Sequence, residues 1–340
     1  MARRMNDPIH VYDEPSARDL PEGPEALLDW LRGPTLFRRQ GRDRSRVRAV
    51  IGLLHGNEPS GLVALHRALL HPEPFAVDTL LFLGAVEAAR AEPRHGHRML
   101  PGRRDLNRSF GLPPSDTDTR IAAAARRLLG ERLPEAVIDV HNNTGENPAY
   151  GVGLRESETL LGLTRLFARR FIHTEYRMGT LIETFDASCP ALTIEAGRAG
   201  DPAADALAAR GVLDFLTLPR LEALPREPAV QVLRRAIRVE LAPGLELAYA
   251  HEPTAADLVL DVDLDRHNFC ELAPGSRIGF VRAAVWPLRA VAADGRERSR
   301  ELFEVEAGEL FTRVPMVPVM ITTQPAMARA DCLFYALSPS

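Results

Sequence analysis

The chain has 340 residues, 45% of them hydrophobic, which is enough for one large core or for a catalytic domain with a smaller companion. Its formal net charge of −4 offers no general attraction to nucleic acids or acidic membranes, so we expect neither as a partner. The three cysteines form no Cys-x-x-Cys pair, which argues against a disulfide framework and favours a reducing compartment. The basic start lacks the apolar stretch of a secretory signal, and no apolar run approaches the ~20 residues that span a bilayer. We therefore expect a cytoplasmic protein.

Strand-like and helix-like segments alternate along the first two thirds of the sequence. The predicted strands are residues 47–54, 79–86, 136–140 and 190–194, and the predicted helices are residues 60–70, 120–133, 157–170 and 201–216. Pro59 suits the first turn of the first of these helices, and Asp201 suits the N-cap of the last. This alternation predicts an α/β/α sandwich with a mostly parallel, mixed central sheet.

The pattern changes at a proline-rich stretch, residues 224–230. Beyond it, short alternating segments such as RAIRVEL and DLVLDVDL are separated by turn signals such as Pro243-Gly244. We therefore predict a catalytic domain over residues 1–225 and a smaller β-rich domain over residues 226–340.

The motif HGNEPSG lies where the first predicted strand ends and a helix is about to begin. Ligand sites of open α/β sheets cluster at the carboxyl ends of strands. His55 and Glu58, presented from one turn in which Gly56 lets the backbone bend sharply, can supply two of three protein ligands to zinc. Alone, such a pair is more often two polar loop residues.

A second candidate, His141, ends another apolar strand in AVIDVHNNTG. It completes a set of two histidines and one glutamate that leaves a fourth zinc position open for water. Asp139 points to the same side of the strand, where it could accept a ring N–H of His141 and fix the tautomer. A capped or solvated strand residue is an equally good interpretation of Asp139.

Glu195 emerges from a third apolar strand, in PALTIEAG. Burying a carboxylate is costly without a partner. Next to a metal site, it can take a proton from water and later deliver it to a leaving amine. An ion pair with an arginine such as Arg198 is the alternative, but it would not explain three strand ends with groups typical of zinc hydrolases.

The segment RMLPGRRDLNRSF offers Arg98, Asn107 and Arg108 between a strand and a helix. An arginine fork binds a carboxylate through two hydrogen bonds, and asparagine adds a directional donor. A second arginine could stabilise the oxyanion of a tetrahedral intermediate. A solvated, arginine-rich loop is the alternative.

Taken in order, HGNEPSG, RMLPGRRDLNRSF, DVHNNTG and TIEAG resemble the motifs of the succinylglutamate desuccinylase and aspartoacylase family, a branch of the zinc carboxypeptidase-like hydrolases. The resemblance covers about residues 50 to 200. It implies a carboxypeptidase-like fold and one Zn²⁺ per chain, held by His55, Glu58 and His141.

The resemblance also implies roles for the other motif residues. Glu195 would be the general base and Arg98 the group on the carbonyl oxygen, with Asn107 and Arg108 on the substrate carboxylate. Extra residues separate Arg98 from DLNR compared with some members, so Arg103 and Arg104 compete for its role.

The implied reaction is hydrolysis of the amide bond of a small, carboxylate-bearing N-acyl amino acid. The alternatives are a zinc carboxypeptidase acting on peptide C-termini, a hydrolase of another carboxylate-bearing metabolite, and a metal-binding member without catalysis. In several members a C-terminal tyrosine reaches the site, whereas here only Tyr335 lies beyond the corresponding stretch. The acyl group therefore stays open, as does assembly into a homo-oligomer.

The remaining histidines carry no predicted role. His95 and His97 lie in PRHGHR, a polar loop that we expect to be solvated. Five others fall outside any cluster and are expected to be structural or on the surface, namely His66, His71, His173, His251 and His267.

Overall fold

The computed structural model describes residues 8–282, 284 and 286–338 and divides them into two compact units. The first unit holds the described residues up to Asn142 together with Ala149–Phe171 and Arg177–Gln231. The second holds Asn143–Pro148, Ile172–Tyr176 and the described residues from Val232 onward. The sequence placed its division at residues 225 and 226, and the two short segments that join the second unit have no counterpart in that prediction.

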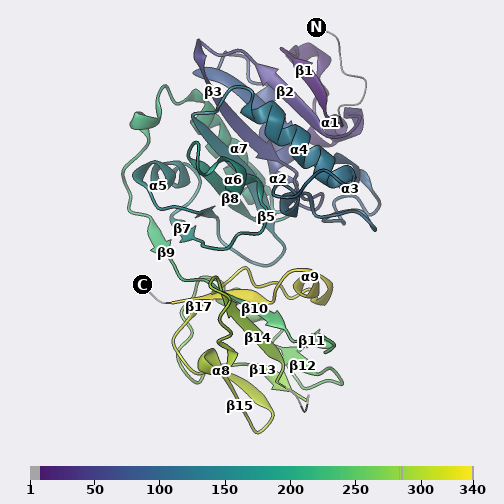
Figure 1. Ribbon diagram of the computed structural model, residues 1–340, viewed down its shortest axis with the longest axis vertical. Coiled ribbons are helices and arrows are strands. Elements are labelled where there is room, and N and C mark those ends of the chain that lie inside the picture. The colour runs from purple at the N-terminus through teal and green to yellow at the C-terminus, as the bar shows by residue number, and fades with distance from the viewer. Residues whose placement is uncertain (1–7, 283, 285, 339–340) are drawn as a thin grey trace. The chain divides into compact units, whose positions relative to one another are not determined.

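A nine-stranded sheet has most of its residues in the first unit, and its strands have the order β1-β2-β4-β3-β5-β8-β6-β7-β9 (Figure 1). The strands are β1 His10–Asp13, β2 Thr35–Arg39, β3 Asp43–Gly52, β4 Val77–Leu83, β5 Ala136–Asn143, β6 Tyr150–Gly153, β7 Arg170–His173, β8 Ala191–Arg198 and β9 Gln231–Leu233. β3 pairs in parallel with both β4 and β5, whereas β2 with β4 and β6 with β8 are antiparallel. The sheet is therefore mixed, as predicted.

Helices cover both faces of this sheet. They are α1 Pro24–Trp30, α2 Ser60–Leu69, α3 Val86–Arg90, α4 Thr117–Gly130, α5 Glu158–Arg165, α6 Leu181–Phe185 and α7 Pro202–Thr217, with short 3-10 turns at Ala17–Asp19, Leu106–Arg108 and Leu221–Ala223. Ile51 of β3 packs in one apolar cluster with Ile121 of α4 and Leu181 of α6. Arg48 of the same strand stacks on Phe215 of α7, and because side chains alternate along a strand, α7 lies on the opposite face. The α/β/α sandwich is confirmed.

The predicted segments recur with shifted ends. The segment predicted as a strand over residues 79–86 runs past β4 into the first residue of α3. The helix predicted over residues 157–170 corresponds to α5, which ends at Arg165, and the last residue of the predicted range, Arg170, is the first residue of β7. Asp201 does cap α7, because its side chain accepts a hydrogen bond of 2.8 Å from the Ala203 N–H.

Strand β3 and helix α2 touch through two glycines. A Cβ on Gly61 would lie 2.7 Å from the Gly52 Cα, and one on Gly52 would lie 2.8 Å from the Gly61 backbone. The helix can therefore begin directly against the end of the strand, which keeps the connecting turn short. Gly56 in that turn also fits closely, because its Cβ would lie 2.6 Å from the backbone of Ala88. Between β3 and α2, Leu53 rather than Gly56 has a left-handed backbone, with a φ of 56°.

The second unit is rich in strands, as predicted. One sheet has the order β14-β10-β18-β17, and another has the order β11-β12-β13-β16-β15. The strands are β10 Ile237–Leu241, β11 Leu247–Tyr249, β12 Leu258–Leu260, β13 Arg277–Val281, β14 Leu288–Ala292, β15 Phe303–Glu306, β16 Glu309–Thr312, β17 Val317–Val319 and β18 Phe334–Leu337, with α8 Ser299–Leu302, α9 Pro325–Ala330 and a 3-10 turn at Leu264–His267. In the described part of the chain, no helix has the length and apolarity needed to cross a membrane.

Candidate metal centre and active site

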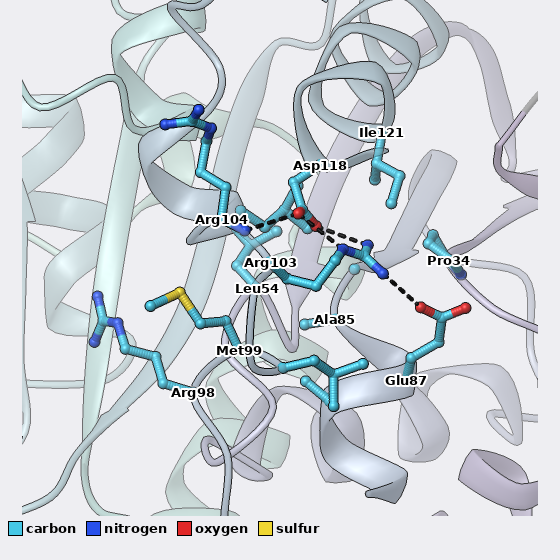
Figure 2. A pocket seen from close by; sticks show the side chains of 14 residues that line it. Pro34, Leu54, Ala85, Glu87, Arg98, Met99, Arg103, Arg104, Asp118 and Ile121 are labelled. Atoms are coloured by element: carbon cyan, nitrogen blue, oxygen red, sulfur yellow. Dashed lines mark hydrogen bonds and ion pairs between the residues drawn. The ribbon is translucent and has the colours of Figure 1, made fainter. Parts of the chain in front are cut away.

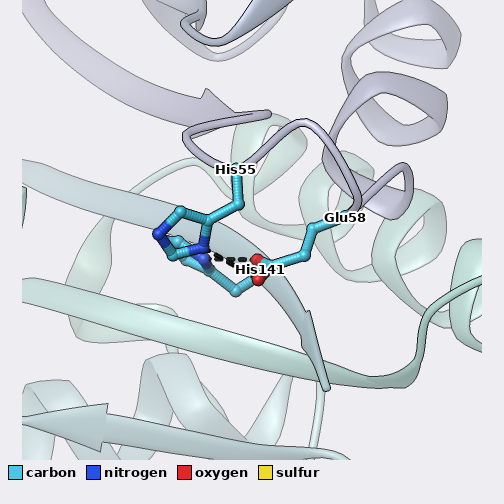
Figure 3. A group of neighbouring side chains, drawn as sticks. All are labelled: His55, Glu58 and His141. Carbon is cyan, nitrogen blue, oxygen red and sulfur yellow. Dashed lines mark hydrogen bonds and ion pairs between the residues drawn. The ribbon is translucent and has the colours of Figure 1, made fainter. Parts of the chain in front are cut away.

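The three predicted metal ligands converge at the carboxyl ends of β3 and β5 (Figure 3). His55 and Glu58 come from the turn between β3 and α2, and His141 comes from β5. All three side chains are buried, and one ligand atom from each lies within 4.8 Å of the other two. The Nδ1 atoms of both rings face the same carboxylate, since His55 Nδ1 is 2.8 Å from Glu58 Oε1 and His141 Nδ1 is 2.6 Å from Glu58 Oε2.

The other nitrogen of each ring is held by a carboxylate. His55 Nε2 is 3.0 Å from Asp105 Oδ1, and His141 Nε2 is 2.8 Å from Asp139 Oδ2. An acceptor at Nε2 keeps the proton on that nitrogen, so the Nδ1 lone pair points at Glu58. The contact proposed for Asp139 is therefore present. Asp105 performs the same task for His55, and no sequence pattern indicated it.

This donor set fits a divalent cation. With neutral rings, each Nδ1 lone pair would face a carboxylate oxygen at 2.6 or 2.8 Å, which is repulsive unless a proton or a cation lies between them. The carboxylates of Glu58, Asp105 and Asp139 contribute a charge of −3, which two protons or one divalent ion equally reduce to −1. Nitrogen and oxygen donors are typical of zinc sites, as are carboxylates that accept a hydrogen bond from the second nitrogen of each histidine ligand.

The site electrostatics favour the ionised forms of these groups. Burial would raise the pKa of the Glu58 carboxyl, but the facing rings of His55 and His141 hold it well below its usual range. Burial would lower the pKa of His141, but Asp139 and Glu58 raise it well above its usual range. Burial would also raise the pKa of Asp105, yet His55 and Arg98 hold it well below its usual range. The Glu58 and Asp105 carboxylates are therefore charged and the His141 ring is protonated, so a divalent cation that binds here would take the place of the proton between His141 Nδ1 and Glu58.

Glu195 is buried in β8, where it pairs with Tyr150 of β6. Burial raises the pKa of its carboxyl to about 7, against the opposing charge of His141. A group with that pKa can both accept and release a proton near neutrality.

Arg98, Arg103 and Arg104 were the candidates for the group on the carbonyl oxygen. Of these three, Arg98 faces the metal ligands. Its Nε and Nη2 atoms each lie 2.9 Å from Asp105 Oδ2, and its Nη1 lies 3.9 Å from Glu58 Oε1. Arg103 instead forms two ion pairs, with Asp118 at the start of α4 and with Glu87 of α3. All three arginines line the pocket beside these helices, but in Figure 2 the Arg98 guanidinium points away from that of Arg103.

Arg104 is directed outward as well, because its Nε binds Asp116 at 3.0 Å on the surface. The geometry thus separates Arg98 from both of its competitors.

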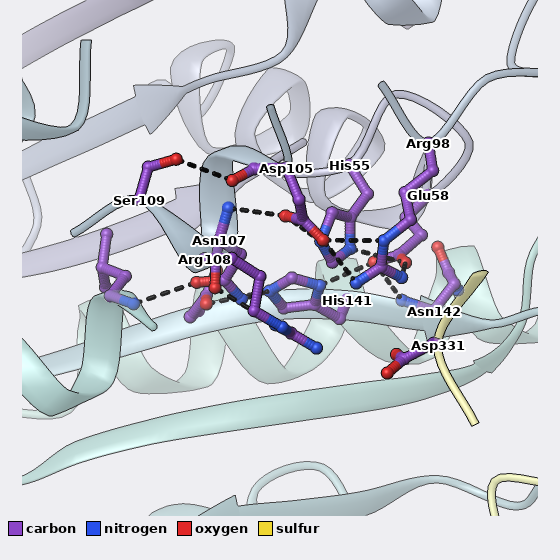
Figure 4. A network of polar contacts seen from close by, with 12 residues as sticks. His55, Glu58, Arg98, Asp105, Asn107, Arg108, Ser109, His141, Asn142 and Asp331 are labelled. Atoms are coloured by element: carbon purple, nitrogen blue, oxygen red, sulfur yellow. Dashed lines mark hydrogen bonds and ion pairs between the residues drawn. The ribbon is translucent and has the colours of Figure 1, made fainter. Parts of the chain in front are cut away.

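Asn107 and Arg108 follow Asp105 in a 3-10 turn beside the ligands (Figure 4). The Asn107 Oδ1 accepts a hydrogen bond of 2.9 Å from the Leu181 N–H, and its Nδ2 lies 3.2 Å from His141 Nε2. Because His141 Nε2 donates its proton to Asp139, it cannot also accept from Asn107. With this tautomer, the Asn107 NH₂ group has no acceptor at His141. Arg108 donates to the Asn107 carbonyl at 3.1 Å.

His95 is not the solvated loop residue that we expected. Its Nδ1 lies 2.9 Å from the Gly56 carbonyl oxygen and its Nε2 lies 3.1 Å from Glu25. The Gly56 N–H in turn donates to the Arg98 carbonyl at 3.0 Å. The segment with Arg98 therefore holds the ligand turn through both polar groups of Gly56.

His251 also has neighbours that the sequence did not indicate. Its Nδ1 lies 3.6 Å from Asp261 and its Nε2 lies 3.7 Å from Asp263, with 66% of the side chain exposed. One ligand atom from each of these three residues lies within 4.8 Å of the other two, as in the set around Glu58, but His251 is exposed and both carboxylates are only half-buried. Tyr335 lies in β18, buried against the Tyr176 ring at 5.6 Å between centroids.

The comparisons with known proteins find likeness in structure only. No protein-family model and no curated protein sequence matches the chain. A succinylglutamate desuccinylase/aspartoacylase from Rhodobacter sphaeroides aligns with a TM-score of 0.59 at 14% identity, covering 89% of this chain and 88% of that chain. The succinylglutamate desuccinylase from Chromobacterium violaceum gives 0.56 at 16% identity, covering 89% and 88%. Murine aminoacylase 3 gives 0.53 at 18% identity, covering 88% and 96%. The chain therefore has the fold of the succinylglutamate desuccinylase and aspartoacylase structures.

Proposed function

We propose that this chain is a zinc-dependent hydrolase of the succinylglutamate desuccinylase and aspartoacylase family, which cleaves the amide bond of a small N-acyl amino acid. The observation that carries the proposal is the convergence of two Nδ1 atoms on Glu58, with both rings oriented from behind by carboxylates. The printed names of the similar structures, desuccinylase, aspartoacylase and aminoacylase, support the same class of substrate.

In the proposed site, His55, Glu58 and His141 hold the zinc ion. Bound there, zinc would supply a Lewis acid for the scissile carbonyl and for water. Glu195 takes a proton from the attacking water while the water oxygen bonds to the carbonyl carbon. When the C–N bond breaks, Glu195 gives that proton to the leaving nitrogen. The products are a free amine and a carboxylic acid, which releases the second water proton as it ionises to the carboxylate.

The arginines divide the negative charge of substrate and intermediate between them. The Arg98 guanidinium, directed by Asp105, stabilises the charge that develops on the carbonyl oxygen. Arg108 and the Asn107 amide bind the carboxylate of the amino acid. This arrangement predicts that substrates without that carboxylate are hydrolysed poorly.

The test is zinc content by mass spectrometry together with hydrolysis of a panel of N-acyl amino acids and C-terminal peptides. About one zinc per chain and activity on the N-acyl amino acids are expected for the unaltered protein. His141→Ala should lose both, and Glu195→Gln should keep zinc but lose hydrolysis. His71→Ala is the matched histidine control, because that ring contacts the Glu73 carbonyl away from the site. No zinc and no hydrolysis after zinc is added, or full activity in Glu195→Gln, would overturn the proposal.

A further inference from the structure

The Asn142 side chain joins three segments at the end of β5 (Figure 4 shows it beside Glu58 and His141). Its Oδ1 accepts a hydrogen bond of 3.0 Å from the Ser60 N–H at the start of α2. Its Nδ2 donates to the Ser60 Oγ at 2.8 Å and to the Gly197 carbonyl of β8 at 3.2 Å. Its own backbone N–H lies 3.3 Å from Glu58 Oε2. One buried amide therefore links the ligand turn, the strand with His141 and the strand with Glu195.

The orientation of this amide depends on a residue farther from the metal ligands. Asp205, in the first turn of α7, accepts the Ser60 hydroxyl proton at 2.6 Å. Since that proton points to Asp205, the lone pairs of the Ser60 Oγ are left to accept from Asn142. The chain of donors thus runs in one direction, from the amide through the hydroxyl to the carboxylate. Without Asp205, the Ser60 hydroxyl can rotate and compete for the same acceptors as Asn142.

We propose that Asn142 is a positioning residue that sets the spacing between the His55–Glu58 turn and the Glu195 strand, and that Asp205 orients it through Ser60. The inference rests on the proposed function. Ser60 is only two residues from Glu58, and Gly197 is two residues from Glu195. A change in the Asn142 hydrogen bonds therefore reaches a metal ligand and the general base together. Among the described residues, Asp205 has no contact with Glu58 or Glu195, so its effect on them passes through Ser60.

The start of α7 offers two aspartate substitutions that separate the effect on Ser60 from the effect on the helix. Asp205→Ala removes the acceptor of the Ser60 hydroxyl, whereas Asp201→Ala removes the N-cap of the same helix without touching Ser60. Asp205→Asn keeps an oxygen that can accept the Ser60 proton. Asn142→Asp keeps the side-chain volume but replaces the donating NH₂ group by an acceptor. Each purified protein is titrated with zinc against a chromogenic chelator, and kcat and KM are measured on the substrate that the unaltered protein hydrolyses.

We expect the zinc dissociation constant to rise about tenfold in Asp205→Ala and more in Asn142→Asp, the scale seen when groups behind metal ligands are removed. Both changes should lower kcat with little effect on KM. For Asp205→Asn, we expect a zinc dissociation constant and a kcat within about twofold of those of the unaltered protein, because the Ser60 hydroxyl keeps an acceptor. Asp201→Ala should leave zinc affinity and kcat unchanged while lowering the unfolding temperature.

Two kinds of failure are distinguishable. If the unaltered protein binds zinc but Asp205→Ala and Asp201→Ala have the same zinc affinity and kcat, the positioning role is overturned and the proposed function stands. If Asp205→Ala does not fold, Asn142→Asp decides by the same criterion. If the unaltered protein binds no zinc, the proposed function falls and the positioning role falls with it.

Discussion

Asp105 offers the sharpest test of how the site is assembled. Its Oδ1 accepts from the Asn107 N–H at 2.8 Å and from His55 Nε2 at 3.0 Å, and its Oδ2 accepts from two nitrogens of Arg98 at 2.9 Å each. Asp105→Asn leaves one acceptor oxygen and introduces an NH₂ group. Two of the four donors must therefore face another donor.

The backbone decides which pair loses its acceptor. The Asn107 N–H is fixed by the 3-10 turn, so the NH₂ group cannot occupy the Oδ1 position without a donor–donor contact. The amide oxygen should stay with Asn107 and His55, and the NH₂ group should face Arg98, whose long side chain can move away. Losing one oriented donor to a developing oxyanion lowers kcat about 10²-fold, or about 2.7 kcal/mol. Zinc affinity should change much less, since His55 keeps its acceptor.

The assay measures kcat and the zinc dissociation constant on one preparation of Asp105→Asn. Asp116→Asn is the control, because Asp116 also accepts from a backbone N–H and an arginine, but at the start of α4. The control should retain both kcat and zinc affinity. An unchanged kcat in Asp105→Asn would refute the role given to Arg98. A loss of zinc with unchanged turnover per bound zinc would refute the reasoning about the amide orientation.

Two further predictions concern packing and burial. Gly61→Ala should destabilise the protein by about 1–3 kcal/mol in urea unfolding and weaken zinc binding, because the new Cβ meets the Gly52 backbone. Gly130→Ala, whose Cβ meets nothing within 4 Å, should be neutral or stabilising, and equal losses in both would contradict the close contact of β3 and α2. Iodoacetamide at pH 8 should modify one cysteine of the native protein, the exposed Cys270, since burial raises the pKa of Cys189 to about 11 and of Cys332 to about 12. Mass mapping that finds either buried cysteine modified at the same rate as Cys270 would contradict this burial.

The architecture of the first unit was predictable because it depends on local periodicity. Apolar runs of strand length followed by polar groups placed His55, Glu58 and His141 at neighbouring strand ends, and the parallel pairing of β3 with β5 brings those ends together. The ends of the helices were less predictable. The sequence continues its helical pattern past Arg165, whereas in the structure α5 ends there and β7 begins at Arg170.

Of the groups behind the ligands, only Asp139 was predictable, because it lies two residues from His141 on the same strand, whereas the partners of the others are distant in sequence. Asp105 lies 50 residues from His55, and His95 lies 39 residues from Gly56. Neither has a spacing that distinguishes it from an ordinary loop residue. Asn142 lies next to His141 and was still missed, since its contacts to Ser60 and Gly197 depend on how three elements pack. The roles given to Arg98, Asn107, Arg108 and Glu195 remain predictions for the experiments above.

The way in which the chain divides between the two units has a consequence for how such a protein can evolve. The second unit takes Asn143–Pro148 and Ile172–Tyr176 from within the sequence of the first. Inside the second unit, Asn147 accepts a hydrogen bond from the Met320 N–H at 3.1 Å, and the Tyr176 hydroxyl donates to the Val291 carbonyl at 2.5 Å. The two units are therefore not consecutive segments of the chain, and recombination at a single junction could not exchange one of them. A foreign C-terminal segment would have to match two short stretches already encoded upstream, the first of them beginning two residues after His141, so the two units are expected to be inherited together.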